Sequence, residues 1–85
     1  MSRALTLSRT IVPLPERERF FTRARALRTH FQSRGCQYWV FEDADLAGAF
    51  IEFAEGTDVD ALTAAYTSAP ESGADPERIY REVAL

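Results

Sequence analysis

Two neighbouring stretches, Gly35-Cys36-Gln37-Tyr38-Trp39-Val40-Phe41-Glu42 and Gly48-Ala49-Phe50-Ile51-Glu52-Phe53-Ala54-Glu55-Gly56, are rich in aromatic residues. Successive side chains of a β-strand point to opposite faces of its sheet. Tyr38 and Trp39 therefore point to opposite faces, and each strand carries large apolar groups on both faces. A short acidic connection over residues 43–47 joins the two stretches. We predict a hairpin that needs a partner on each of its two faces.

The residues before this hairpin predict a strand and a helix. Apolar and polar residues alternate from Ala4 to Val12, which is typical of a strand. A helix over residues 15–34 is indicated by Pro15, which suits the first helical turn, and by one apolar stripe. Gly35 is suited to end this helix. The stripe consists of Phe20, Ala24, Leu27 and Phe31.

The residues after the hairpin predict a second helix and a last strand. Thr57 and Asp60 have the spacing of a capping box, so a helix should begin at Thr57 and end near Ser68. Pro70 to Pro76 is predicted to be a loop. Alternation resumes from Ile79 to Leu85 and indicates a strand. The apolar stripe of the second helix is Val59, Leu62 and Tyr66.

The predicted order is β-α-β-β-α-β, within a single domain over residues 1–85. This order indicates an α+β, ferredoxin-like fold, in which a four-stranded antiparallel sheet carries both helices on one face. The other face is then bare. A chain of 85 residues buries a small core, and oligomerisation is one way to stabilise it.

Composition narrows the class of protein. The net charge of −3 argues against a nucleic-acid-binding protein, which normally carries a basic surplus. A single cysteine, Cys36, fits a reducing cytoplasm. The sequence has neither a long apolar run nor an apolar N-terminal segment, so we expect a cytoplasmic protein that is not associated with a membrane. All ten basic residues are arginine and alanine is frequent, which suggests a bacterial source with a GC-rich genome.

The bare sheet face predicts a homodimer. If this face carries Tyr38, Val40 and Phe50, a monomer would expose an apolar patch that soluble monomers rarely tolerate. Two sheets packed face to face about a twofold axis would cover it. The alternative is a monomer, either with a few exposed aromatic residues or with a tail folded back over the face, for which the tails of this chain are too short.

The same features resemble a known family. They include Pro-Leu-Pro at 13–15, the arginine-rich helix, Tyr-Trp-Val-Phe-Glu at 38–42, Gly48 and Phe-Ile-Glu-Phe-Ala-Glu-Gly at 50–56. Together they are similar to the dimeric α/β-barrel superfamily, which includes the antibiotic-biosynthesis monooxygenase-like and stress-responsive barrel proteins. The resemblance implies two sheets that form a barrel across a dimer, with a cavity either between the sheet and the helices or within the barrel.

The resemblance also implies a range of activities. Members extend from cofactor-independent monooxygenases and haem-degrading enzymes to proteins without a known role. The oxygenases tend to use an asparagine, a tryptophan and often a histidine. The present chain contains no asparagine, and Trp39 cannot be aligned with a catalytic tryptophan. This departure weighs against an oxygenase.

Glu52 is the most informative candidate residue. If Phe41 pairs with Ala49, Glu52 shares its face with Tyr38 and Val40, and this face should look into the dimer. A slip of one residue would exchange the two neighbours for Trp39 and Phe41. Burial among aromatic groups disfavours a charged carboxylate, so Glu52 could act as an acid or a base. The alternative is an ion pair with Arg81 or Arg9.

His30 is the only histidine. An imidazole can exchange a proton near neutral pH, so His30 is a candidate general base or haem ligand, against the alternative of a surface histidine. The arginines that crowd the first helix indicate a solvated face or a site for an anionic partner. Glu42, Asp43 and Asp45 lack the ligand order of a calcium loop, and no metal site or cofactor is expected.

Three functional hypotheses follow. The first is a binding or auxiliary protein that holds a small apolar or aromatic molecule in a sheet-lined cavity. The second is a cofactor-independent, monooxygenase-like enzyme with Glu52 or His30 as its base, and the third is haem binding or degradation through His30. The residues expected to line the cavity are Tyr38 or Trp39, Phe50 and Glu52.

Overall fold

A computed structural model describes residues 2–69 and 78–85. The elements follow the predicted β-α-β-β-α-β order. Residues 70–76, which were predicted to form a loop, lie outside the described residues. In chain order, the elements are β1 (Ala4–Ile11), the 3-10 turn η1 (Leu14–Glu16), α1 (Arg17–Ser33), β2 (Gln37–Glu42), β3 (Ala49–Gly56), α2 (Val59–Thr67) and β4 (Tyr80–Arg81).

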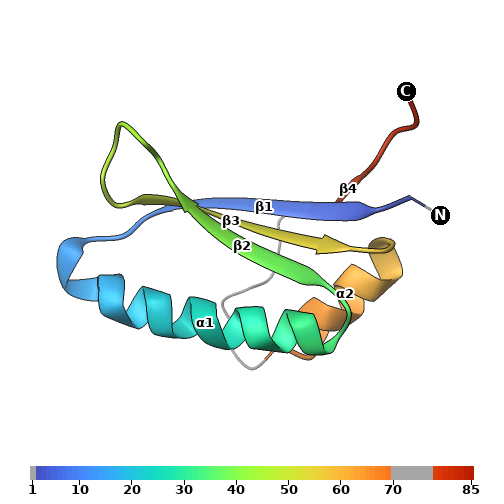
Figure 1. The fold of residues 1–85 in the computed structure, drawn as a ribbon, viewed down its shortest axis with the longest axis horizontal. Helices are drawn as coiled ribbons and strands as arrows, with labels where there is room; N and C mark the ends of the chain where they lie inside the picture. The colour runs from blue at the N-terminus through green and yellow to red at the C-terminus, as the bar shows by residue number, and fades with distance from the viewer. Residues whose placement is uncertain (1, 70–77) are drawn as a thin grey trace.

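The four strands form one antiparallel sheet in the order β2-β3-β1-β4. Both helices lie on the same side of this sheet, as Figure 1 shows. The protein is therefore an α+β domain with an open sheet, compatible with the predicted ferredoxin-like fold. Within the described ranges, neither helix combines the length and the apolar content that a membrane crossing requires.

The hairpin register differs from the predicted one by two residues. Phe41 pairs with Ile51 and not with Ala49, and Val40 pairs with Glu52. A shift of two residues keeps every side chain on its predicted face, because the strand repeat is two. Glu52 therefore shares its face with Tyr38 and Val40, as expected, but this face looks toward the helices and not into a dimer, because Glu52 pairs with Arg23 of α1.

The helix-facing side of the sheet holds the core. All four residues of the predicted stripe on α1, from Phe20 to Phe31, are buried. Phe31 stacks on Tyr38 with ring centroids 5.6 Å apart, and Phe20 stacks on Phe50 at 4.9 Å. From α2, Leu62 is completely buried against the same layer. The apolar stripes of the two helices thus cover the same face of the sheet.

These contacts correct the predicted composition of the bare face. Tyr38 and Phe50 are buried beneath α1, and Val40 packs beside them, so none of the three lies on the open side. The hairpin is apolar on both faces, so its pattern alone could not decide which face the helices cover. The ring contacts of Phe20 and Phe31 decide it.

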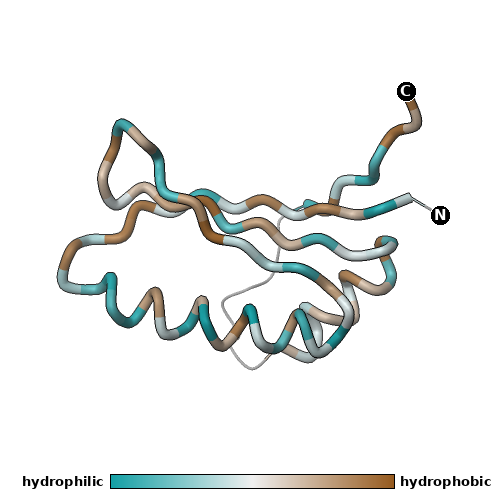
Figure 2. Tube along the Cα trace, in the orientation of Figure 1, coloured by the Kyte–Doolittle hydropathy of each residue, from teal (hydrophilic) through white to brown (hydrophobic). Residues whose placement is uncertain are grey.

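The face away from the helices, here called the open face, is nevertheless apolar. Phe53 lies between two apolar neighbours on this face, because it pairs with Trp39 on β2 and with Leu7 on β1. Figure 2 shows hydrophobic positions along the strands as well as along the helices. The apolar residues of the open face are Leu5, Leu7, Ile11, Trp39, Phe41, Ile51 and Phe53.

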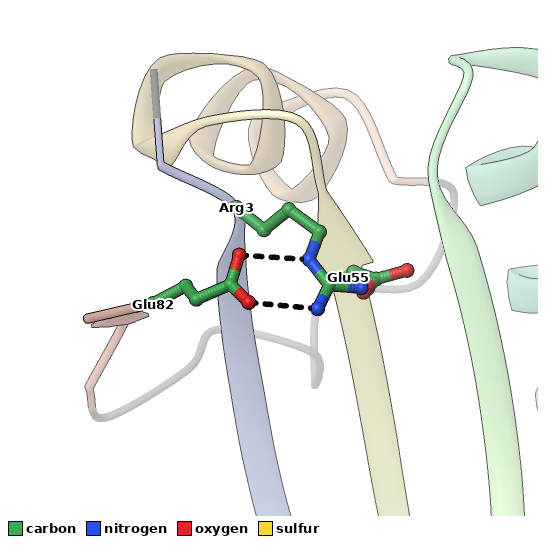
Figure 3. Close-up of polar contacts among 3 residues, drawn as sticks. All are labelled: Arg3, Glu55 and Glu82. Carbon is green, nitrogen blue, oxygen red and sulfur yellow. Dashed lines mark hydrogen bonds and ion pairs between the residues drawn. The ribbon is translucent and has the colours of Figure 1, made fainter. Parts of the chain in front are cut away.

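The last strand is shorter than predicted. Only Tyr80 and Arg81 pair with β1, and the residues from Glu82 to Leu85 continue without strand structure. Arg3 holds this end of the chain, because its guanidinium donates two hydrogen bonds to Glu82, at 3.0 and 2.9 Å, and one to Glu55, at 2.9 Å (Figure 3). Three separate segments are thus joined at one end of the strands.

The helix ends agree with the sequence in one case and differ in the other. Gly35 follows α1 with a φ of +74°, a left-handed conformation that glycine adopts at low cost. The cap of α2 is Asp58 and not Thr57, because the Asp58 carboxylate accepts a hydrogen bond from the Ala61 amide at 2.7 Å. The capping residue is displaced by one position.

Candidate functional site

Glu52 lies on the helix-facing side of β3 and is bound by two side chains. Arg23, on α1, places Nη2 at 3.1 and 3.2 Å from the two carboxylate oxygens. The Tyr38 hydroxyl donates a hydrogen bond to Oε1. The side chains of Arg23 and Glu52 are 26% and 13% exposed, so water reaches this ion pair poorly. Glu52 is thus a charged group enclosed between a helix and the sheet.

The partner of Glu52 differs from the two arginines expected. Arg9 lies on the open face and approaches Asp43 at 3.9 Å, while Arg81 pairs with Ala4 on the far side of β1. Ser8 is the β1 residue opposite Glu52, so Arg9 points to the other face. The predicted ion pair exists, but its cation comes from α1.

Tyr38 and Tyr66 place two phenols in the layer between helices and sheet. Burial raises the pKa of Tyr38, and the hydrogen bond to Glu52 raises it further. Burial also raises the pKa of Tyr66, whose hydroxyl lies 2.5 Å from Thr6 Oγ1. Both phenols therefore remain protonated and act as hydrogen-bonding groups.

A groove of about 570 Å³ runs between α1 and β2. Its volume lies within the range of small-molecule sites. Its apolar wall includes Ala24 and Val40, and the remaining apolar surface is aromatic. Its aromatic lining residues are Phe21, Tyr38, Trp39, Phe41 and Phe50.

The groove also has charged residues in its lining. Arg25 and Arg28 contribute from α1, and Glu42 contributes from the end of β2. Glu42 Oε2 accepts a hydrogen bond from the Gly48 amide at 2.9 Å. Among the described residues, the Arg25 guanidinium bonds only to Thr22 Oγ1, at 3.3 Å. An aromatic cleft flanked by guanidinium groups can bind flat, electron-rich molecules.

His30 joins the two helices. Its Nε2 lies 2.8 Å from the carbonyl oxygen of Ala65 and 3.2 Å from Ser68 Oγ. Since a carbonyl only accepts, Nε2 carries the proton in the contact with Ala65. This carbonyl belongs to the last turn of α2, where a helix lacks internal donors. His30 therefore satisfies a helix end in the described structure.

The remaining candidate groups do not form a site in the described part of the chain. Cys36 is buried, and burial raises the pKa of its thiol, which keeps it protonated and unreactive. Residues 2–69 and 78–85 contain no group of three histidine, cysteine or acidic residues that could hold a metal ion.

The fold brings together some of the residues expected from the sequence. Tyr38, Trp39 and Phe50 all line the groove. Glu52 contacts Tyr38 but is not a lining residue, and His30 belongs to the contact between helices. The cavity was expected either between the sheet and the helices or within a barrel; this groove lies beside α1, with Trp39 and Phe41 of the open face also in its lining.

Sequence reasoning missed Phe21, Arg25 and Arg28 as lining residues. The signal was present, because Phe21 follows the buried Phe20 directly and points off the apolar stripe, and the arginines occur at one-turn intervals after it. That these side chains face β2 depends on how α1 packs on the sheet, which the sequence alone does not reveal.

Comparisons of this chain with known protein families, with curated proteins and with solved structures gave no match.

Proposed function

We propose that this protein binds a small apolar or aromatic molecule in the groove between α1 and β2, and that it works as a homodimer. The groove carries the first part of the proposal. It combines a ligand-sized volume with five aromatic side chains, and aromatic faces stack on flat ligands in offset or edge-on arrangements.

The open face supports the second part. Leu5, Leu7 and Ile11 lie on this face, do not line the groove, and expose between 36% and 56% of their surface, although they are large and hydrophobic. Covering such a patch removes apolar area from water, which stabilises the complex by about 25 cal/mol per Å² of buried apolar surface. A second copy of the same sheet is the complementary partner, and it would give the barrel arrangement of the superfamily that the sequence resembles.

Trp39 gives a direct test of ligand binding, because it is the only tryptophan and lines the groove. We propose to incorporate fluorotryptophan and follow its fluorine NMR signal during titration with naphthylmethanol, a neutral two-ring probe. The signal should shift in a saturable manner. Phe21→Ala should weaken binding about fivefold or more, because it removes one aromatic wall that is not on the open face.

Leu14→Ala is the matched control, because Leu14 is exposed and does not line the groove. It should leave the titration unchanged. If the probe fails to saturate, or if Phe21→Ala binds as well as the original chain while remaining folded, groove binding is refuted.

Sedimentation equilibrium tests the dimer. Leu7 lies on the open face opposite Phe53, so Leu7→Asp places a charge within the proposed interface and should give a folded monomer. Leu14→Asp adds the same charge away from the sheet and should remain dimeric. A monomeric original chain at micromolar concentration would contradict the dimer without affecting the test of the groove.

A further inference from the structure

The distribution of charge along the groove points to the chemical class of its ligand, an inference that rests on the proposed binding function. α1 and β2 run in opposite directions, and two aromatic contacts fix their alignment. Phe31 stacks on Tyr38 at the start of β2, while Phe21 meets Phe50, the partner of Glu42, at its end. The two ends of the groove are therefore chemically different.

The arginines and the carboxylate of Glu42 line different parts of the groove. Arg28 precedes Phe31 by about one turn, so it lies toward the Tyr38 end, and Arg25 lies between Arg28 and Phe21. Glu42 lies at the Phe21 end and is held by the Gly48 amide. Among the lining residues, the positive charges of Arg25 and Arg28 thus lie at the middle and at one end of the groove, and the carboxylate of Glu42 lies at the opposite end.

Neither groove arginine has an acidic partner in the described residues. The ion pairs there use Arg3, Arg9 and Arg23, and Arg25 has only the Thr22 hydroxyl. An unpaired guanidinium beside an apolar wall can bind a carboxylate through two parallel hydrogen bonds. Arg19 is also exposed and unpaired in this part of the chain, but it does not line the groove.

We infer that the groove binds a small aromatic carboxylic acid, with its ring system against Trp39, Phe41 and Phe21 and its carboxylate toward Arg28 and Arg25. The orientation follows from the charges, because the reverse placement would bring the acid toward Glu42. A volume of about 570 Å³ admits a molecule of one or two rings with a short substituent.

The test compares naphthoate with naphthylmethanol, two probes of nearly equal shape that differ in charge. With fluorotryptophan at position 39, naphthoate should bind about five- to tenfold more tightly, the gain expected of a partly exposed charge-assisted contact. Arg28→Gln and Arg25→Gln should lower naphthoate affinity more than alcohol affinity, so that the ratio of the two affinities falls toward one. Arg28→Lys should retain part of the preference.

Arg19→Gln is the matched control, because it removes the same charge from the same helix outside the groove. It should leave the preference for naphthoate intact. Equal affinities for the two probes, or an equal loss with Arg19→Gln, would overturn the assignment of an acid while leaving groove binding in place. Failure of both probes to bind would instead overturn the proposed function itself.

Discussion

Nη2 of Arg23 lies 3.1 Å from Oε2 of Glu52, and this pair links the middle of α1 to the central part of the sheet. The carboxylate is only 13% exposed, so its solvation depends on Arg23 and Tyr38. Arg23→Met should leave a poorly hydrated charge without its cation. We expect the free energy of unfolding to fall by about 1–3 kcal/mol.

Urea denaturation measures this loss, and Arg19→Met on the same helix is its control, with an expected change within about 0.5 kcal/mol. Adding Glu52→Gln to Arg23→Met should restore part of the stability, because the unpaired charge is then removed. Additive effects of the two substitutions would show that the ion pair contributes no coupling energy.

Tyr38 predicts a loss of stability at alkaline pH. Burial, followed by the hydrogen bond to Glu52, raises the folded-state pKa of Tyr38 above its ordinary value near 10. Its contribution is therefore complete below pH of about 10 and declines as the pH rises from there toward the folded-state pKa. Tyr38→Phe should lose about 1 kcal/mol near neutral pH and show a shallower alkaline decline.

Tyr66 has its pKa raised by burial as well, so the decline should become smaller in Tyr38→Phe without disappearing. Tyr80→Phe is the control, because Tyr80 is half exposed on the open face. Chemical denaturation over a series of pH values measures these profiles. Identical profiles for Tyr38→Phe and the original chain would contradict the role of the buried phenol.

His30 should contribute to stability through the Ala65 carbonyl. His30→Ala removes the donor at 2.8 Å and should cost about 1 kcal/mol. His30→Gln offers an amide donor of similar reach and should retain part of this contribution. Thermal denaturation measures both, and hydrogen exchange should show faster exchange in the last turn of α2 for His30→Ala. Equal stability of His30→Ala and the original chain would contradict the link between helices.

The element order followed from local patterns, whereas the composition of each sheet face did not. The α1 stripe, Gly35 and the alternation in the strands each report on a single element; the first two were confirmed, and the alternation located β1 and β4, although β4 is shorter than its alternating stretch. The hairpin is apolar on both faces, so choosing the covered face required knowing that Phe31 stacks on Tyr38. Periodicity contains no such information about contacts between elements.

The candidate site was predictable only for residues on β2 and β3. Tyr38, Trp39 and Phe50 were identified because large aromatic groups in strands signal a packed or binding surface. Arg23 and Arg28 lie one to two turns apart on a helix with many arginines, and the sequence does not distinguish them. Their different roles depend on how α1 is rotated over the sheet, which its packing against Phe50 and Tyr38 determines.

Glu82 should make attachment of the C-terminal strand sensitive to acid. Hydrogen bonds from Arg3, and then its charge, lower the pKa of Glu82 in the folded chain. A lowered pKa contributes stability above the ordinary value near 4.3 and loses it as the pH falls through the folded-state pKa. The hydrogen bond from the Glu82 amide to the Arg3 carbonyl, 2.8 Å long, should therefore weaken in acid.

The Glu82 amide signal in proton–nitrogen NMR spectra follows this change, and Glu82→Gln should remove its acid dependence. High salt should reduce the effect, because both side chains are more than half exposed and exposed ion pairs are screened. If the amide signal of residue 82 showed an acid transition of equal size in Glu82→Gln, the transition would belong to another carboxylate.

Gly48 should be less tolerant of substitution than Gly35, although both have a positive φ, at +89° and +74°. A Cβ atom at Gly48 would meet the Arg17 guanidinium and lie 3.1 Å from the Val12 carbonyl oxygen, while one at Gly35 meets nothing within 4 Å. Gly35→Ala should therefore cost about 1 kcal/mol from backbone strain alone. Gly48→Ala should cost about 2 kcal/mol or more, since crowding against the backbone adds to that strain.

Urea denaturation compares the two variants, and equal losses would show that the chain at Val12 moves aside without cost. Because the Gly48 carbonyl also accepts a 2.8 Å hydrogen bond from the Val12 amide, such movement would have to preserve this bond.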